Sequence, residues 1–230
     1  MRKLLPGILV ILLLFGSVIQ AEQTRDEKYI SKPKLDIGLN LGTNGGFGAE
    51  ISGMVSNLTQ NTPINLRFVV GYSSLDPGIG DEARQVFIND ATNGTLSENG
   101  HLYDLKFDVV VPFKIFSLEQ SFLYAGPRYT KFTANFIYVG GNEDFYIRSK
   151  QWGFGTGLES YFPINPKFNL VITSGVDYMK KSILEGHDTS YSPSGDTGNE
   201  RNDYTFEDAD NAINQPKFEL KLMIGFTYSI

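Results

Sequence analysis

The 230-residue sequence has no cysteine and only two histidines, and after residue 20 it has no apolar run long enough for a helix to cross a membrane. The absence of cysteine excludes disulfide frameworks, thiolate metal sites, cysteine nucleophiles and a lipid anchor on cysteine. With only His101 and His187, chemistry that requires several imidazoles is excluded as well. The missing apolar runs exclude a polytopic helical membrane protein, but they leave open a membrane protein that is built of strands.

The N-terminal residues have the pattern of an export signal. Two basic residues precede an apolar stretch from Leu4 to Ile19, and Ala21 supplies the small residue at which signal peptidases cut. We therefore expect a signal peptide over residues 1–21, cleaved after Ala21, and a flexible lead-in over residues 22–34. Cleavage would remove two of the 20 basic residues and none of the 26 acidic residues. The resulting acidic chain argues against nucleic acid as a partner.

From residue 35 onward, apolar and polar residues alternate with the period of two that is typical of strands with two different faces. The clearest run is the last one, in which the seven even-numbered residues from Phe218 to Ile230 are all apolar or aromatic. The longest polar interruptions are residues 76–100, with one helical turn expected around residues 82–86, and residues 184–216. Eight runs predict strands over residues 35–41, 47–55, 64–72, 103–113, 122–138, 152–162, 168–178 and 218–230.

The connections between these runs differ in length by parity. Those after the second, fourth and sixth runs are short. Among the others, those after the third and seventh runs are long, the one after the fifth, residues 140–148, is intermediate, and only the one after the first is short. Short turns at one rim and longer loops at the other are typical of outer-membrane barrels. We therefore predict an all-β fold, an eight-stranded antiparallel up-and-down transmembrane β-barrel over residues 35–230.

Alternation alone does not distinguish a membrane barrel from a soluble, exported lipid-binding barrel, whose apolar face points inward. Three features favour an apolar face that contacts lipid. This face is almost free of charge, aromatic residues gather near the strand ends, and Gly153, Gly155 and Gly157 follow one another on the polar face, as a narrow lumen requires. The soluble barrel stays the alternative.

The fifth run is the least regular of the eight. Pro127 lies inside it and suggests a β-bulge, which would let Arg128 leave the apolar face. Thr133 and Asn135 are expected on the polar face. The residues expected on the apolar face are Phe122, Tyr124, Phe132, Phe136 and Tyr138.

The last run resembles the C-terminal targeting signal of outer-membrane barrels. In that signal a glycine is followed by hydrophobic or aromatic residues in the third-last and last positions, here Gly225, Tyr228 and Ile230. The signal usually ends in phenylalanine, and Met223 stands where it usually has a polar residue. With the signal peptide and the strand count, the mature chain resembles the small eight-stranded family that includes the OmpA barrel, OmpX and the opacity-type proteins. The resemblance implies the outer membrane of a Gram-negative-type cell, outer-membrane lipids as neighbours and recognition by the barrel assembly machinery.

Charged residues on the polar face are expected to line the lumen, where they should pair because buried charges need partners. Glu50 and Arg67 lie on adjacent strands as a candidate pair, and Lys106 is flanked by two aspartates on its own strand. The favoured interpretation is a plug of charged pairs, and the alternative is a narrow porin-like conduit. The expected lumen residues are Asp36, Glu50, Arg67, Asp104, Lys106, Asp108, Glu159, Asp177, Glu219 and Lys221, joined by Arg128 should the bulge turn it inward.

A lipid-A-modifying enzyme is a further alternative, because the barrel size resembles that of deacylases and acyltransferases that use a histidine, a serine and an acidic residue near the outer rim. His187 and Ser190 lie in the last loop with Asp188 or Glu185, and His101 opens the fourth run. No His-x-Ser pair falls on one strand face. We therefore expect no catalytic residues and no cofactor.

The long loops are the expected place for function. Hard oxygen ligands in the last loop suggest a cation, but no calcium-loop spacing is present and a solvated acidic loop is the simpler interpretation. Long loops on a rigid barrel suit recognition, so a structural or adhesin-like surface role is expected, with an extracellular ligand at residues 76–100 and 184–216. The acidic residues in question are Asp188, Asp196, Glu200, Asp203, Glu207, Asp208 and Asp210.

Overall fold

The computed structural model describes residues 33–58, 63–88, 93–114, 120–141, 143–196 and 199–230. The chain divides into two units, Met1–Lys32 and Pro33–Ile230, and all described residues belong to the second. The expected signal peptide and nearly all of the lead-in lie outside the described residues. Within the described part of the chain, no helix has the length and apolar character needed to cross a membrane.

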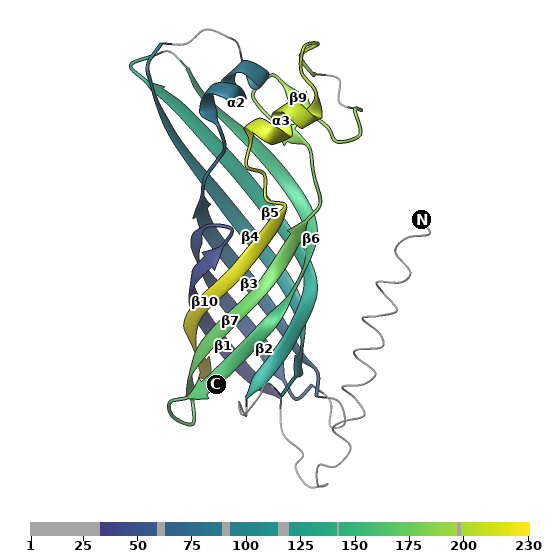
Figure 1. Cartoon of the computed structure of the whole chain (residues 1–230). Coiled ribbons are helices and arrows are strands. Elements are labelled where there is room, and N and C mark those ends of the chain that lie inside the picture. Colours follow the sequence, from purple (N-terminus) through teal and green to yellow (C-terminus); the bar gives the residue numbers. More distant parts are fainter. Residues whose placement is uncertain (1–32, 59–62, 89–92, 115–119, 142, 197–198) are drawn as a thin grey trace. The chain divides into compact units, whose positions relative to one another are not determined.

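Residues 33–230 contain a closed barrel of eight antiparallel strands (Figure 1). Its strands are β1 (Lys34–Asn44), β2 (Phe47–Ser56), β3 (Asn65–Leu75), β4 (Thr95–Pro112), β5 (Ser121–Val139), β6 (Asp144–Pro163), β7 (Phe168–Met179) and β10 (Phe218–Ser229). Each strand pairs with the next one along the chain, and β1 closes the barrel by pairing with β10. This arrangement confirms the predicted up-and-down topology.

The alternation in the sequence gives the barrel a largely polar inner face and an apolar outer face. In β10, Lys221 and Met223 are buried in the lumen, whereas Leu220 and Leu222 are 70% and 62% exposed on the outer wall. Large apolar side chains are exposed in the same way on β1, β2, β3, β4, β6 and β7. The apolar face therefore points outward, as expected where the barrel wall contacts lipid and not as in a soluble lipid-binding barrel.

β5 faces the opposite way from the prediction. Its even-numbered residues point inward, so Tyr124, Phe132 and Phe136 are fully buried, while Thr133 and Asn135 lie half-buried on the outer face. The prediction was wrong because it assigned every apolar run to the lipid. The C-terminal part of β5 instead extends past the lumen, and there its inward-facing side chains pack in an apolar core.

The predicted β-bulge at Pro127 is also absent. β4 and β5 keep one register on both sides of the proline, and pairing lapses only where Phe107 and Asp108 lie opposite Pro127 and Gly126. Proline has no N–H group to donate, so it interrupts the ladder without inserting an extra residue. Arg128 faces the lumen because its even position places it there.

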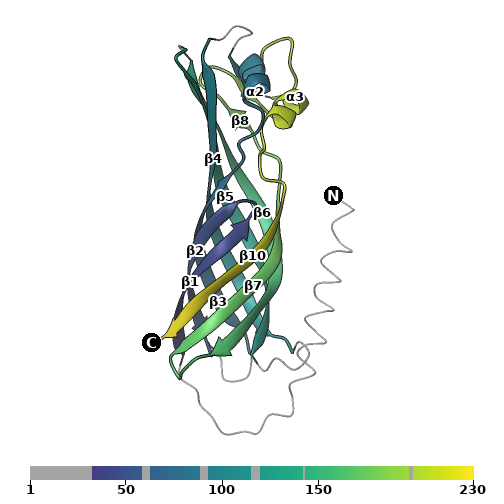
Figure 2. The same ribbon diagram turned by 60° about the vertical axis from the view of Figure 1, so that its left-hand side comes forward.

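Three neighbouring strands continue beyond the rest of the barrel. β4, β5 and β6 have 18, 19 and 20 residues, whereas the other five barrel strands have 10 to 12. A transmembrane strand needs about 9 to 11 residues, so the excess projects past the membrane on the side of the long loops (Figure 2). The predicted loop over residues 140–148 consequently shrinks to residues 140–143, and β4 begins inside the predicted irregular segment 76–100.

The two long loops also contain regular structure. The first contains α2 (Gly80–Phe87), which confirms the helical turn expected around residues 82–86, and the second contains β8 (Leu184–Glu185), β9 (Ser190–Tyr191) and α3 (Phe206–Ala212). Both helices lie at the same end of the barrel, beside the projecting strands (Figure 2). We call the described residues of segments 76–94 and 180–217 the cap.

Candidate functional site

Eight charged side chains form one continuous series of ion pairs inside the lumen. They come from seven of the eight barrel strands, and each side chain is at most 4% exposed. Such depth is possible only because each charge has a partner, since an isolated buried charge is strongly unfavourable. In order, the series runs through Glu159, Arg67, Asp108, Arg128, Asp177, Lys106, Glu50 and Lys221.

Two guanidinium groups hold one aspartate between them. Arg128 donates from Nη1 to Asp108 Oδ1 at 2.6 Å and from Nε to Asp177 Oδ1 at 2.7 Å. Arg67 donates from Nη2 to the other oxygen of Asp108, also at 2.7 Å, and from Nη1 to Glu159. These contacts join β3, β4, β5, β6 and β7 through hydrogen bonds between charged groups, which are the stronger kind.

Two lysines form the other end of the series. Lys106 Nζ lies 2.7 Å from Glu50 Oε1, 3.1 Å from Asp177 Oδ2 and 3.7 Å from Asp104 Oδ2. Lys221 Nζ lies 2.8 Å from the same oxygen of Glu50. Glu50 is thus held by lysines from β4 and β10.

The expected pair of Glu50 and Arg67 does not form. Arg67 lies opposite Met54 in the β2–β3 register, and Met54 is four residues along β2 from Glu50. Four residues along a strand correspond to about 13 Å, which separates the two charges by more than a hydrogen bond can span. Arg67 and Glu50 instead pair with residues of strands that are not their neighbours, Glu159 on β6 and Lys106 on β4, because the long side chains reach across the lumen.

The other three predicted lumen residues are not links in this series. Asp104 branches from it, because its Oδ2 lies 3.7 Å from Lys106 Nζ and also accepts a hydrogen bond from Asn44 at 3.3 Å. Asp36 is buried and accepts a hydrogen bond from Ser229. Glu219 is half-buried, and no ion pair to it is present among the described residues. Buried acids in the lumen consequently outnumber the buried bases, six to four.

Tyr124 lies against this network and was missed by the sequence interpretation. Its ring lies 4.4 Å from the Cζ of Arg67, and its hydroxyl donates to the carbonyl of Ser174 at 3.2 Å. A Cβ atom at Gly157 or Gly175 would overlap that hydroxyl. The run of glycines in β6 was the available signal, because the residue opposite Gly157 in the register is Tyr124.

An apolar layer lies on the side of the network where β2, β4 and β6 reach their C-terminal ends. Its five buried members are Met54, Val110, Tyr124, Tyr161 and Val171, and Phe122 packs against them. Phe122 and Tyr161 meet edge to face, with ring centroids 5.3 Å apart. The charged network is therefore bordered on this side by closely packed apolar side chains.

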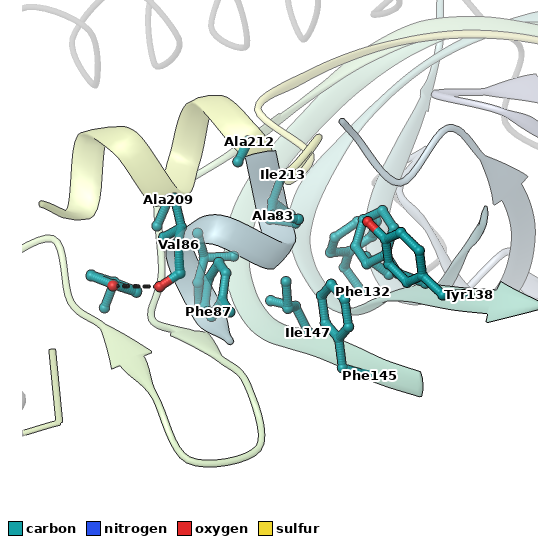
Figure 3. Packing of buried hydrophobic residues seen from close by; sticks show 14 of the residues in the cluster. Ala83, Val86, Phe87, Phe132, Tyr138, Phe145, Ile147, Ala209, Ala212 and Ile213 are labelled. Atoms are coloured by element: carbon teal, nitrogen blue, oxygen red, sulfur yellow. Dashed lines mark hydrogen bonds between the residues drawn. The ribbon is translucent and has the colours of Figure 1, made fainter. Parts of the chain in front are cut away.

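At the other end of the barrel, the cap has an apolar core of its own. α2 contributes Ala83, Val86 and Phe87, and α3 contributes Ala209 and Ala212 (Figure 3). These helices pack on the inner face of the projecting strands. The short strands β8 and β9 add Leu184 and Tyr191, and the residues that the projecting strands contribute are Leu102, Phe132, Ala134, Phe136, Tyr138, Phe145 and Ile147.

Hydrogen bonds fix the two loops of the cap to each other. Ile79 N donates to Ala212 O at 2.8 Å, the hydroxyl of Tyr191 donates to Val86 O at 2.8 Å, and Thr189 Oγ1 donates to Phe87 O at 3.0 Å. Each bond links the first long loop to the second. The cap therefore has one defined arrangement, held by buried contacts between segments about 100 residues apart in the sequence.

Acidic residues of the last loop stabilise the cap locally. Asp208 and Thr205 form a capping box at the start of α3, and the hydrogen bonds from Thr205 lower the pKa of Asp208. Asp210 is buried and pairs with Lys181 at 2.8 Å and Lys217 at 3.0 Å, and its hydrogen bond raises the pKa of Lys181. Across the described ranges, no group of three or more histidine, aspartate or glutamate side chains is placed to hold a metal ion.

The residues of the enzyme alternative are not brought together. His187 pairs with the neighbouring Asp188 at 2.8 Å, and both side chains are largely exposed. Ser190 lies opposite Glu185 in the short β8–β9 pair. His101 lies on β4 and its Nδ1 is 2.7 Å from the hydroxyl of Tyr72. A histidine, serine and acid in catalytic contact are therefore not seen among these residues.

The residues of the C-terminal signal lie at the seam where the barrel closes. Gly225 lies opposite Asn40, so close that a Cβ atom would overlap the carbonyl of Leu39. Tyr228 faces outward with its ring 5.2 Å from that of Phe168, and Ile230 N donates to Leu35 O at 2.9 Å.

A closed barrel of eight strands, an outward apolar wall and a charged lumen define a small β-barrel protein of the outer membrane. Among solved structures, the chain is similar to a major outer membrane protein from Thermus thermophilus, with 25% identity and a TM-score of 0.73 over 87% of this chain and 100% of that chain. It also matches Ail, the attachment invasion locus protein of Yersinia pestis, with 12% identity and a TM-score of 0.46 over 86% and 97% of the two chains. CarO2 of Acinetobacter baumannii matches with 12% identity and a TM-score of 0.41 over 87% and 100%. No protein-family model and no curated protein matches the sequence.

Proposed function

We propose that this outer-membrane barrel has a structural and surface-interaction role, that its cap is the recognition element, and that it is not an enzyme. The apolar core of the cap is the observation that carries the proposal. Two loops that had only to cover the lumen would not need helices packed on projecting strands. A buried core presents the exposed cap residues in one fixed arrangement, which lowers the entropic cost of binding a partner.

The surface role is tested with liposomes that carry the purified mature protein. They are applied to arrays of immobilised glycans and extracellular-matrix proteins, beside liposomes that carry Phe87→Ser, a variant that places a polar group in the cap core. We expect the wild type to bind a defined subset of the array and Phe87→Ser to lose that binding while its barrel still shifts on a gel between unheated and boiled samples. Binding that is equal for both proteins, or no greater than that of protein-free liposomes, would overturn the role of the cap.

We propose further that the charged series plugs the lumen. Eight strands leave room for side chains but hardly for a channel, and the series is bordered by the apolar layer around Met54 and Val171. The conduit alternative is supported by the excess of buried acids and by the buried oxygens of Asn40, Asn44 and Asp104 that have no hydrogen-bond partner among the described residues. Single-channel recording in a planar bilayer decides between them, because a plugged barrel never conducts, whereas a conduit of this charge passes cations.

The absence of catalysis is tested on lipid A. Masses of lipid A from cells with and without the gene should be identical, since His101 and His187 are not placed beside a serine and an acid. A mass difference that disappears in the His101→Ala and His187→Ala variants would replace this proposal with a lipid-A-modifying enzyme.

Export and assembly complete the proposal. We propose that the signal peptide of residues 1–21 is cleaved after Ala21, that residues 22–34 form a lead-in to the barrel domain of residues 35–230, and that Gly225, Tyr228 and Ile230 are recognised by the barrel assembly machinery. N-terminal sequencing of the protein from outer membranes should begin at Glu22. Removal of Ile230 should lower the amount of assembled barrel in cells. The stability of the same variant refolded from denaturant should fall only by the contribution of one terminal hydrogen bond, from Ile230 N to Leu35 O.

A further inference from the structure

An apolar groove of about 260 Å³ runs along the outer wall of the barrel at Pro127. The small ring of the proline lies between larger neighbours, with Phe107 opposite it on β4 and Tyr129 and Trp152 in the next row. Pairing between β4 and β5 lapses at this point, as described above. The groove is thus an apolar hollow in the outer wall, and it faces the membrane. Its outward-facing side chains are Phe68, Leu105, Phe107, Pro127, Tyr129 and Trp152.

An aromatic pair lies at the edge of the groove that is nearer the cap. Tyr129 and Trp152 lie opposite each other on β5 and β6, with ring centroids 5.0 Å apart, and Trp152 is 65% exposed. Tyrosine and tryptophan at the ends of the apolar wall are typical of the boundary between hydrocarbon and headgroups. The groove therefore opens on the hydrocarbon side of that boundary.

Two lysines lie immediately beyond the aromatic pair. Lys131 and Lys150 are directly opposite each other in the register, two residues past Tyr129 and two before Trp152, which corresponds to about 7 Å along each strand. Both point to the outer face and are exposed. Like charges directly opposite each other on neighbouring strands are unfavourable unless an anion lies between them.

The surroundings do not supply that anion. Among the described residues, no acidic side chain forms an ion pair with Lys131 or Lys150. In the next row outward, Arg148 lies opposite Thr133 on one side and opposite Glu185 on the other. The one acid in these rows therefore faces the arginine and not the two lysines.

We propose that this part of the wall binds one phosphate-bearing lipid of the outer leaflet, with its phosphate between Lys131 and Lys150 and an acyl chain in the groove at Pro127. The order of the features along the strands matches the order of the parts of such a lipid: an apolar groove, an aromatic boundary and then a pair of positive charges. Basic side chains at this depth attract anionic headgroups. The proposal depends on the outer-membrane location and is independent of the recognition role proposed for the cap.

The chain carries its own probe for the test, because Trp152 is its single tryptophan. The mature protein is reconstituted in phosphatidylcholine vesicles that contain a small fraction of phosphatidic acid with brominated acyl chains, which quench tryptophan fluorescence on contact. We expect quenching of Trp152 to report a local enrichment of phosphatidic acid on the order of tenfold over brominated phosphatidylcholine at the same fraction. Equal quenching by the two lipids would overturn the proposal.

Matched variants separate this site from general charge attraction. Lys131→Gln with Lys150→Gln should reduce the enrichment to nearly that of random mixing. Lys114→Gln with Lys167→Gln removes the same charge from exposed positions at the opposite rim and should leave the enrichment unchanged. Unbrominated phosphatidic acid should restore the fluorescence, whereas inorganic phosphate in millimolar excess should not; if inorganic phosphate competes equally, the wall binds simple anions and the lipid site is wrong.

Discussion

Arg128 and Asp177 meet across an intervening strand, with the guanidinium Nε 2.7 Å from the carboxylate Oδ1. The residue between them on β6 is Gly155, which lies opposite Asp177 in the register. A Cβ atom at Gly155 would overlap the carboxylate and come within 2.5 Å of Nε. A residue without a side chain is therefore what allows this ion pair to form.

The first prediction tests that requirement. Gly155→Ala should lower the free energy of unfolding by about 1 to 3 kcal/mol, because an added methyl group in a packed interior forces its neighbours apart. The measurement is urea-induced unfolding in lipid vesicles, followed by the fluorescence of Trp152. Gly53→Ala is the control, since a Cβ atom at Gly53 meets nothing within 4 Å and should leave the stability within about 1 kcal/mol of the wild type.

The second prediction concerns the charge of Arg128. Arg128→Met removes one of the two basic partners of Asp108 and of Asp177, and breaking one side of a buried ion pair typically costs about 3 to 5 kcal/mol. Because each aspartate keeps its other partner, we expect a loss near the lower end of that range. Lys114→Met, at an exposed position, should change the stability by less than about 0.5 kcal/mol. In a double-mutant cycle, Asp177→Asn should cost clearly less in the Arg128→Met background than in the wild type, and additive costs would mean that the two residues do not interact.

Most of the barrel was predictable because each strand separates two different environments. β10 shows this plainly, since every even-numbered side chain from Phe218 to Tyr228 lies on the outer wall. The strand count and the two long loops follow from the same alternation. The residues of the lumen series could be named for the same reason, although the pairing of Glu50 with Arg67 was wrong.

β5 and the cap were not predictable from that rule. Phe132 and Phe136 obey the same alternation as lipid-facing residues, but they cover the cap core, because the strand continues past the membrane. One apolar pattern thus serves two environments along a single strand. The sequence does not show where one environment gives way to the other. The boundary depends on packing against α2 and α3, which lie about 50 residues before and about 70 residues after these phenylalanines.

The third prediction separates the cap from the barrel. Ala83→Glu introduces a charge at a fully buried position of α2, beside α3 and the projecting strands, where it has no partner. We expect limited proteolysis to cut the variant within residues 76–94 and 180–217, while the wild type resists at the same protease concentration. Glu82→Ala, an exposed change one residue away, should resist like the wild type. If Ala83→Glu also abolishes the heat-dependent gel shift, the cap and the barrel fold as one unit.

The fourth prediction is a pH limit on the cap that is set by Tyr191. This side chain is fully buried, its hydroxyl donates to Val86 O, and burial raises its pKa above the ordinary value of about 10. The folded cap therefore holds the phenolic proton more tightly than the unfolded cap does. The stability that comes from this proton is fully present below pH 10 and is lost as the pH rises through the raised pKa.

Protease resistance of the cap should accordingly fall in the range above pH 10 in the wild type. Below pH 10, Tyr191→Phe should weaken the cap by about 1 kcal/mol through the lost hydrogen bond. Above pH 10, the variant should decline less steeply than the wild type, because it has no phenol at this position to ionise. Tyr146→Phe, on the outer face of β6 and 39% exposed, should keep the wild-type pH dependence. The pair of Lys181 with Asp210 should not set this limit, because the hydrogen bond raises the pKa of Lys181 and keeps it charged to higher pH. A decline that persists unchanged in Tyr191→Phe would assign the pH limit to another group.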